Sequence, residues 1–276
     1  MSTHPNSSSR IVVYVVLVVG LFLLLQVVQR PRGLRSRPVT PPPAPRAVAT
    51  PQNPIEQMLL AMPVKERRQG TAVAVLVDVS GSMGRPVASG EGRSEPKIEI
   101  ARASLLRLLR QIDRFTQEHP DRLVHVGIYE FSARPRQPSC RCVVPLGPPN
   151  LATQEAAIRA MVPDGDTPIG DALLYAKQQL DGSGLSQQHI LVITDGENNR
   201  GYAPGDVVNV ISRLPEARRA SVYCIAFDIT ADRFRAVRDA GGLVLGAMNE
   251  GELQQTMDYV LTGKILAEQP EVPKAQ

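Results

Sequence analysis

The chain lacks tryptophan and has few aromatic residues and few cysteines. Its 276 residues include no Trp, 4% aromatic side chains and 3 cysteines. Cys140 and Cys142 lie two positions apart, so the three cysteines provide neither a disulfide framework nor the paired spacing of a zinc site. Cys224 stands inside an apolar run, and we expect it to be a buried, small hydrophobic residue.

Acidic residues are absent from the first 54 positions. Six arginines give this segment a charge of +6, so the rest of the chain must sum to −2 for the total of +4. The larger part of the chain is therefore slightly acidic, which argues against a nucleic-acid-binding domain. The basic N-terminal part suits the anionic headgroups of a membrane instead.

Residues 11–29 carry no charge and are almost entirely apolar. As a helix they would span roughly 27 Å, close to the thickness of a hydrocarbon core. A cleaved signal peptide is the alternative, but the only small-x-small site, Ala47–Ala49, lies about twenty residues too far along. We therefore predict a single-pass transmembrane anchor after an N-terminal tail, residues 1–10. The arginines that follow favour a cytoplasmic location for the rest of the chain, although long C-terminal domains can cross regardless.

Residues 30–54 form a segment rich in proline and arginine, with eight prolines from Pro31 to Pro54. Proline fixes φ and has no amide donor, so this segment is not expected to form a helix or a sheet. We interpret it as a semi-stiff linker. A ligand for an SH3-type domain is the alternative.

From about Ile55 the chain has the pattern of a globular protein. We divide it into a lead-in segment 55–69, a domain 70–263 and a C-terminal tail 264–276, which we expect to be flexible. Apolar runs predict strands at 72–78, 123–131, 189–195, 221–229 and 243–247, with a short edge strand at 142–146. Amphipathic patterns predict helices at 97–115, 152–162, 169–180, 206–214, 231–242 and 250–261. This alternation predicts a doubly wound, Rossmann-like α/β fold, in which helices flank a mostly parallel central sheet.

Two of the predicted strands end in an aspartate, Asp78 and Asp195. Ligands of doubly wound folds bind at the carboxyl ends of the strands, so neighbouring strands would bring both carboxylates to one crevice. Two like charges there raise one another's pKa and reduce stability, and a divalent cation is the simplest compensation. Ser80 and Ser82 alternate with Asp78 and can point to the same place. Carboxylates and hydroxyls are hard oxygen ligands, which suit Mg²⁺ or Mn²⁺.

A third segment contributes Thr167, directly before a helix that starts with proline. Taken alone, Thr167 reads as a helix N-cap with Pro168 at the first helical position. Asp195 followed by Gly196 reads alone as a turn. Together the pattern is more specific, because D-x-S-x-S, T-P-x-G-D-A-L and a strand ending in D-G follow one another in this order.

The stretches VLVDVSGSMG, DTPIGDAL and LVITDGEN resemble the metal-ion-dependent adhesion site of von Willebrand factor type A (VWA) domains, and the resemblance extends from about Gly70 to Gly263. It implies that Ser80, Ser82 and Thr167 ligate a metal ion directly. Asp78 and Asp195 would act largely through bound water or as alternating direct ligands. The resemblance also implies a binding module rather than an enzyme, in which an Asp or Glu of a partner protein completes the octahedron. Similar bacterial proteins work beside AAA-type ATPases or in envelope complexes, so we expect a partner of that kind.

Two other functions stay open. The metal could be purely structural in a scaffold protein with no acidic partner. Alternatively, SGSMG resembles the G-x-S-x-G elbow of serine hydrolases with Ser82 as the nucleophile, but Ser80 replaces the leading glycine. A triad would also need a histidine, and the candidates are His4, His119, His125 and His189. Of these, His189 is expected at the amino end of its strand, away from the crevice.

Overall fold

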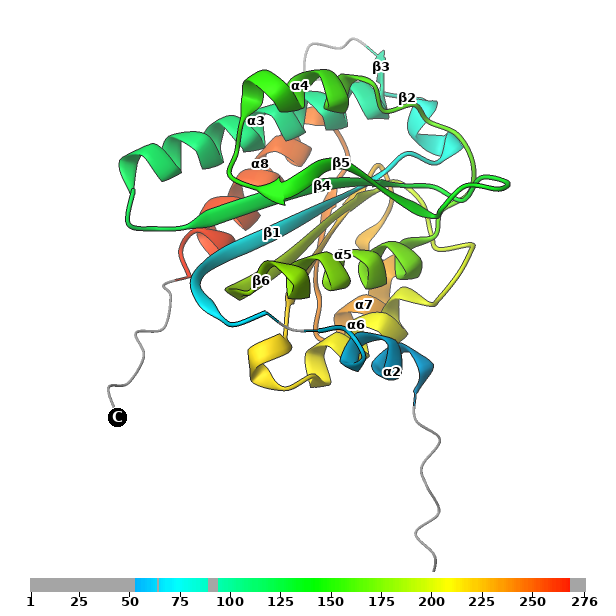
Figure 1. The fold of residues 1–276 in the computed structure, drawn as a ribbon. Coiled ribbons are helices and arrows are strands. Elements are labelled where there is room, and N and C mark those ends of the chain that lie inside the picture. Colours follow the sequence, from blue (N-terminus) through cyan, green and yellow to red (C-terminus); the bar gives the residue numbers. More distant parts are fainter. Residues whose placement is uncertain (1–52, 64, 89–93, 269–276) are drawn as a thin grey trace, which may run out of the picture. The chain divides into compact units, whose positions relative to one another are not determined.

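The computed structural model describes residues 53–63, 65–88 and 94–268 (Figure 1). The predicted anchor at 11–29, the tail before it and nearly all of the linker lie outside the described residues, as do the last eight residues of the chain. None of the helices in the described part is long and apolar enough to cross a membrane.

A six-stranded sheet with the order β5-β4-β1-β6-β7-β8 forms the centre of the fold. All neighbouring pairs are parallel except β4 and β5. β5 therefore lies at an edge of the sheet, as predicted, and runs antiparallel, which the sequence did not indicate. The strands are β1 (Arg68–Asp78), β4 (Val124–Phe131), β5 (Cys140–Gly147), β6 (Leu185–Thr194), β7 (Ser221–Phe227) and β8 (Leu243–Ala247). A separate hairpin consists of β2 (Pro86–Ala88) and β3 (Ser94–Pro96).

Helices cover both faces of the sheet, which confirms the predicted doubly wound α/β fold (Figure 1). One face carries α3 (Lys97–Glu118), α4 (Leu151–Arg159) and α8 (Glu250–Val260). The other face carries α2 (Pro54–Leu60), α5 (Ile169–Ser183), α6 (Pro204–Arg213) and α7 (Arg235–Asp239). Short 3₁₀ and π turns complete the chain at η1 (Gly81–Gly84), η2 (Glu216–Arg218), η3 (Ala231–Phe234) and η4 (Leu261–Ile265).

The central strand β1 is buried on both faces, which explains why its sequence is continuously apolar rather than alternating. Val73, Val75 and Val77 belong to the core under α3 and α8. The residues between them, such as Ala74, belong to the core under α5 and α6. Every residue from Ala72 to Asp78 is fully buried, so the strand delivers its last side chain into the interior rather than into solvent.

Several predicted boundaries differ from the structure, among them the start of β6 and the helix predicted over 231–242. β6 begins at Leu185, four residues before the predicted start, and directly follows Gly184, whose φ of 69° ends α5 in the left-handed conformation. The single helix predicted over 231–242 is instead the turn η3 followed by the short helix α7. The break lies at Phe234, whose φ of −104° and ψ of 25° are not helical and whose side chain is buried in the core.

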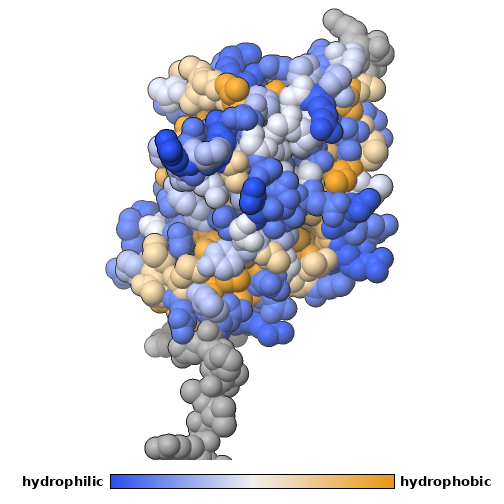
Figure 2. Space-filling model, turned by 90° about the vertical axis from the view of Figure 1, so that its right-hand side faces the viewer, coloured by the Kyte–Doolittle hydropathy of each residue, from blue (hydrophilic) through white to orange (hydrophobic). Residues whose placement is uncertain are grey.

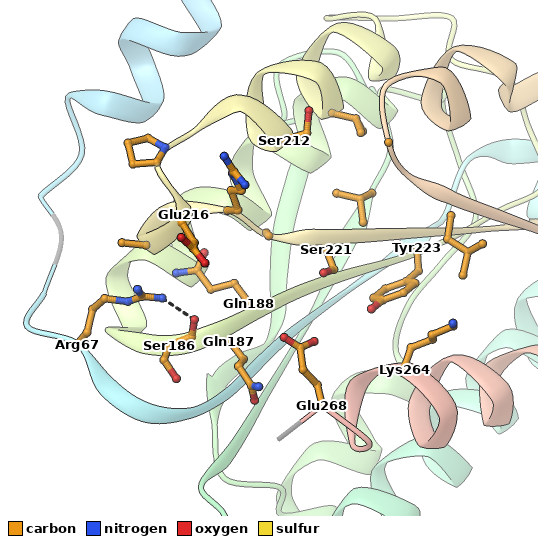
Figure 3. A pocket seen from close by; sticks show the side chains of 18 of the residues that line it. Arg67, Ser186, Gln187, Gln188, Ser212, Glu216, Ser221, Tyr223, Lys264 and Glu268 are labelled. Atoms are coloured by element: carbon orange, nitrogen blue, oxygen red, sulfur yellow. Dashed lines mark hydrogen bonds between the residues drawn. The ribbon is translucent and has the colours of Figure 1, made fainter. Parts of the chain in front are cut away.

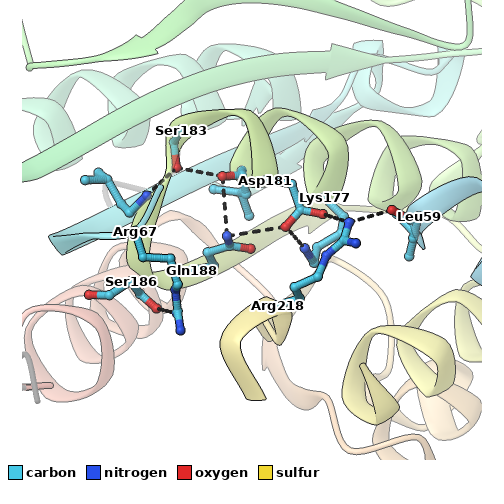
Figure 4. A network of polar contacts seen from close by, with 10 residues as sticks. Leu59, Arg67, Lys177, Asp181, Ser183, Ser186, Gln188 and Arg218 are labelled. Atoms are coloured by element: carbon cyan, nitrogen blue, oxygen red, sulfur yellow. Dashed lines mark hydrogen bonds and ion pairs between the residues drawn. The ribbon is translucent and has the colours of Figure 1, made fainter. Parts of the chain in front are cut away.

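Helix α2, in the lead-in segment, packs onto the domain through apolar and polar contacts (Figure 4). Its buried side chains Ile55 and Leu59 join the core beneath α5 and α6. The guanidinium of Arg218 donates to the Leu59 carbonyl and lies 2.8 Å from Asp181 Oδ2. Asp181 also pairs with Lys177, so a buried cluster of three charges connects α5 to η2 and to α2.

Candidate metal site

The structure brings the five predicted site residues to one edge of the sheet. β1 and β6 are neighbours in parallel register, with Val77 opposite Ile193. Asp78 is therefore the last residue of β1, and Asp195 directly follows the end of β6 at the same edge. Figure 2 views this edge, toward which the parallel strands run, and shows a mainly hydrophilic face with scattered hydrophobic patches.

Asp78 is fully buried, and both of its oxygens accept short hydrogen bonds. Oδ1 accepts from the Ser80 amide at 2.7 Å, and Oδ2 accepts from Thr194 Oγ1 at 2.6 Å. Burial and, to a smaller extent, the charge of Asp195 raise the pKa of this carboxyl to about 7, against the opposing effect of the hydrogen bonds. A cation bound here would favour the ionised form and offset the desolvation of the carboxylate.

The two serines connect the carboxylates through the turn η1. Ser80 Oγ and Ser82 Oγ lie 3.0 Å apart, and Ser82 Oγ donates to Asp195 Oδ1 at 2.7 Å. The turn is fastened to the loop before α5, because the Gly81 amide donates to the Gly165 carbonyl at 3.0 Å. The serine hydroxyls and the Thr167 loop are thus held together by backbone contacts.

Thr167 also reaches this edge, and its role as a helix cap is not seen. The N-cap of α5 is Pro168, with no side-chain capping bond. Instead, the Thr167 amide donates to Asn199 Oδ1 at 2.8 Å, which aligns the loop with the segment after β6. A Cβ on Gly196 would lie 3.2 Å from Thr167 Oγ1 and 3.8 Å from Ser82 Oγ, so both hydroxyls face the same small space beside this glycine.

The donor set fits a small, hard cation. Two carboxylates and three hydroxyls from three loops converge, and oxygen atoms of this kind are the ligands that Mg²⁺ and Mn²⁺ prefer. No group of three or more His, Cys, Asp or Glu side chains suited to a metal occurs in residues 53–63, 65–88 and 94–268. Binding here would therefore depend on the hydroxyls as much as on the carboxylates.

The family model for the von Willebrand factor type A domain matches residues 72–255. The chain belongs to this family. Among solved structures, the VWA domain is similar to the PilB minor pilin from Streptococcus sanguinis, with a TM-score of 0.54, 16% identity, and coverage of 73% of this chain and 62% of that chain. It is also similar to a von Willebrand factor type A protein from Catenulispora acidiphila, with a TM-score of 0.54, 17% identity, and coverage of 73% and 43%.

A third similar structure is proximal thread matrix protein 1 from the mussel byssus with a zinc-occupied MIDAS motif. Its TM-score is 0.51 at 18% identity, with coverage of 71% of this chain and 48% of that chain. The chain thus spans less than two thirds of the length of each of these proteins. No curated protein matches it in sequence.

Three residues of the VWA domain join the site although the sequence pattern did not indicate them. Thr194, which directly precedes Asp195, donates to Asp78. Lys97, the first residue of α3, places Nζ 2.9 Å from Asp195 Oδ2 and 2.7 Å from Asp228 Oδ2. Burial lowers the pKa of Lys97, but the hydrogen bonds to Asp228 and Asp195 outweigh this effect and raise it, so the ammonium is charged.

A large hollow of the VWA domain lies elsewhere (Figure 3). It measures about 1770 Å³ and is lined by residues at the amino ends of β6 and β7, such as Ser186 and Ser221, together with Arg67, Lys264 and Glu268. These strand ends are opposite the edge that carries Asp78 and Asp195. None of the five predicted site residues lines this hollow.

Proposed function

We propose that this VWA domain binds a divalent cation, Mg²⁺ or Mn²⁺, and uses it to capture an acidic side chain of a partner protein. The observation that carries the proposal is the convergence of three hydroxyls and two carboxylates from three loops. As the resemblance to the adhesion site implies, Ser80, Ser82 and Thr167 would ligate the ion directly. Asp78 and Asp195 would act largely through bound water or as alternating direct ligands. The zinc-occupied motif of the mussel protein supports a divalent ion at this place in the fold.

Neutral ligands explain why such a site would favour an external carboxylate. Ser80, Ser82 and Thr167 contribute dipoles but no charge, so they leave the positive charge of a cation largely uncompensated. The bound ion would supply an electrophilic centre for an Asp or Glu of the partner. Asp78, Ser80, Thr167 and Asp195 are buried and Ser82 is half-buried, so Ser82 marks the side of the site that is nearest to solvent.

Exposed hydrophobic side chains at the same edge of the sheet support a protein partner. Val162, Tyr202 and Met248 are 61%, 39% and 49% exposed. They stand on three different loops, before α5, after β6 and after β8. Apolar residues around a polar centre are typical of protein–protein contact surfaces, in which a few anchors carry much of the binding free energy.

We further propose that the domain binds rather than catalyses. Ser82 Oγ donates to Asp195 and not to a histidine, so the described part of the chain shows no Ser–His pair of a serine hydrolase at this residue. His189 lies in the middle of β6 and not at its amino end as predicted, because the strand begins at Leu185, and burial lowers its pKa to about 4. These contacts support a ligand role for Ser82 over a nucleophilic one.

The predicted anchor at residues 11–29 would hold the domain beside a membrane through the linker 30–54. A partner in an ATPase-associated or envelope complex is the proposed setting, on the basis of the family resemblance. No nucleic-acid partner is proposed, because the part of the chain after the linker carries a net charge of −2.

A pull-down from native membranes tests the proposal. The full-length chain in detergent should retain a partner with Mg²⁺ or Mn²⁺ and lose it with a chelator. Thr167→Ala should abolish retention, whereas Thr153→Ala, on the exposed first turn of α4, should not. Retention that is indifferent to chelator would refute capture through a metal. Unfolding of the chain by chelator alone would assign the ion a structural role, and labelling of Ser82 by a serine-reactive probe would favour an enzyme.

A further inference from the structure

The ammonium of Lys97 lies between two carboxylates at the edge of the proposed metal site. It is 2.9 Å from Asp195 Oδ2 and 2.7 Å from Asp228 Oδ2. The Lys97 side chain is 7% exposed and that of Asp195 is fully buried, whereas that of Asp228 is 33% exposed. A cation is thus already built into the site, on the amino-terminal residue of α3.

Asp195 divides its two oxygens between Lys97 and the site. Oδ1 accepts from Ser82 Oγ at 2.7 Å, on the side of the hydroxyls. Oδ2 accepts from Lys97 Nζ. The negative charge that a divalent ion would use is therefore partly compensated in advance, while the carboxylate is held in the orientation that presents Oδ1 to the serine turn.

Asp228 is placed as a second partner for the same ammonium. It directly follows β7 and has a φ of 54°, a left-handed conformation that is uncommon for residues other than glycine. Its amide donates to the Ala247 carbonyl at 2.8 Å, which fixes this backbone against the end of β8. Unfavourable backbone conformations that the surrounding structure enforces are concentrated at functional sites.

We propose that Lys97 is a resident cation that sets the affinity of the site for a divalent ion. In the metal-free domain it neutralises Asp195; once Asp195 serves the ion, Lys97 is held by Asp228. Lys97 is a positioning residue in this scheme and not a metal ligand. The inference rests on the proposed function, because it assigns a role to Lys97 only if the five site residues bind a divalent ion.

The scheme predicts that substitutions at Lys97 and at Asp228 change the affinity for a divalent ion in opposite directions. Lys97→Met removes a positive charge beside the ion and should tighten binding by about tenfold, since charges a few ångströms apart in a partly buried site interact strongly. Asp228→Asn removes the partner that accepts Lys97, so the ammonium stays on Asp195 and affinity should fall about threefold or more. A merely structural salt bridge would shift the affinity in the same direction for both variants.

Isothermal titration of the full-length chain in detergent with Mn²⁺ tests these effects. The variants are Lys97→Met, Asp228→Asn, their double mutant and Lys97→Arg, which keeps the charge and should stay within about threefold of wild type. In the double mutant, Asp228→Asn should change the affinity of Lys97→Met by less than about twofold, because its effect acts through Lys97. Lys264→Met and Asp232→Asn, each lying outside the site, are the matched controls.

The outcomes separate this inference from the proposed function. If neither wild type nor Lys97→Met binds Mn²⁺, the proposed function and the inference about Lys97 are both refuted. If wild type binds Mn²⁺ and Ser82→Ala weakens it, but Lys97→Met binds equally or less tightly, the inference is overturned and the proposed function stands. Circular dichroism identifies a Lys97→Met chain that fails to fold. In that case Asp228→Asn is the deciding variant, because its side chain is partly exposed and the substitution should be tolerated. An unchanged affinity of this variant for Mn²⁺ overturns the inference.

Discussion

His189 should make the stability of the domain depend on pH below neutrality. The imidazole is 1% exposed; Tyr223 Oη lies 3.4 Å from Nδ1, and Glu268 Oε2 lies 3.5 Å from Nε2. Burial lowers its pKa from 6.5 to about 4. Between these two values the unfolded chain binds a proton that the folded domain does not, so stability falls as pH falls. For this single group, the loss between pH 7 and pH 5 is about 2 kcal/mol.

Urea unfolding of the full-length chain at pH 7 and pH 5 measures this loss. Carboxyl groups also titrate in this range, so the loss of unfolding free energy in wild type is compared with that in His189→Gln, which cannot take up the proton. The variant should lose about 2 kcal/mol less than wild type on acidification. His119→Gln, at an exposed ring stacked on Phe115, should behave as wild type. Equal losses for wild type and His189→Gln would refute the reasoning.

Three further predictions concern the site and its support. Gly196→Ala places a methyl group 3.2 Å from a site hydroxyl and should weaken Mn²⁺ binding at least about tenfold in titration calorimetry, whereas Gly182→Ala, with open space around it, should not. Asp181→Asn leaves the buried cations Lys177 and Arg218 without their shared carboxylate and should lower the free energy of unfolding by roughly 3 kcal/mol in urea. Mn²⁺ at a hundred times its Kd should stabilise the chain by about 2.7 kcal/mol, and differential scanning calorimetry with chelator should abolish the gain.

The fold could be predicted largely because the strands of this sheet are buried on both faces. The run 72–78 is continuously apolar up to its final aspartate for that reason, and the neighbouring strands are also mainly apolar. The start of β6 could not be predicted in this way, because residues 185–188 include two buried glutamines. Gln187 accepts from Thr71 Oγ1, 116 residues away in the sequence, and Gln188 donates to Asp181 at the end of α5. Sequence periodicity carries no signal for such partners.

Some residues of the site could be predicted from a short stretch of sequence, and others could not. Asp78, Ser80 and Ser82 lie within five residues, and their convergence follows from one strand end and one turn. Lys97 stands 98 residues before Asp195 in the chain. Its role depends on how the start of α3 meets the ends of β6 and β7, and the sequence shows only a lysine ahead of an amphipathic helix.

The carboxylates of Asp78 and Asp195 have different partners, and this difference determines how the charge of the site is distributed. Asp195 is neutralised by Lys97, whereas hydrogen bonds from Ser80 and Thr194 are the favourable contacts that stabilise ionised Asp78. Hydrogen bonds alone do not offset its burial, as the raised pKa shows. Asp78 cannot turn away from the site, because β1 is packed on both faces up to its last residue. In the metal-free domain the carboxylate that Lys97 leaves unneutralised is therefore that of Asp78, and Asp195 would add its charge once Lys97 is held by Asp228. This explains why neutral hydroxyls, and not further carboxylates, surround it, and why the proposed ion would still attract an acidic partner.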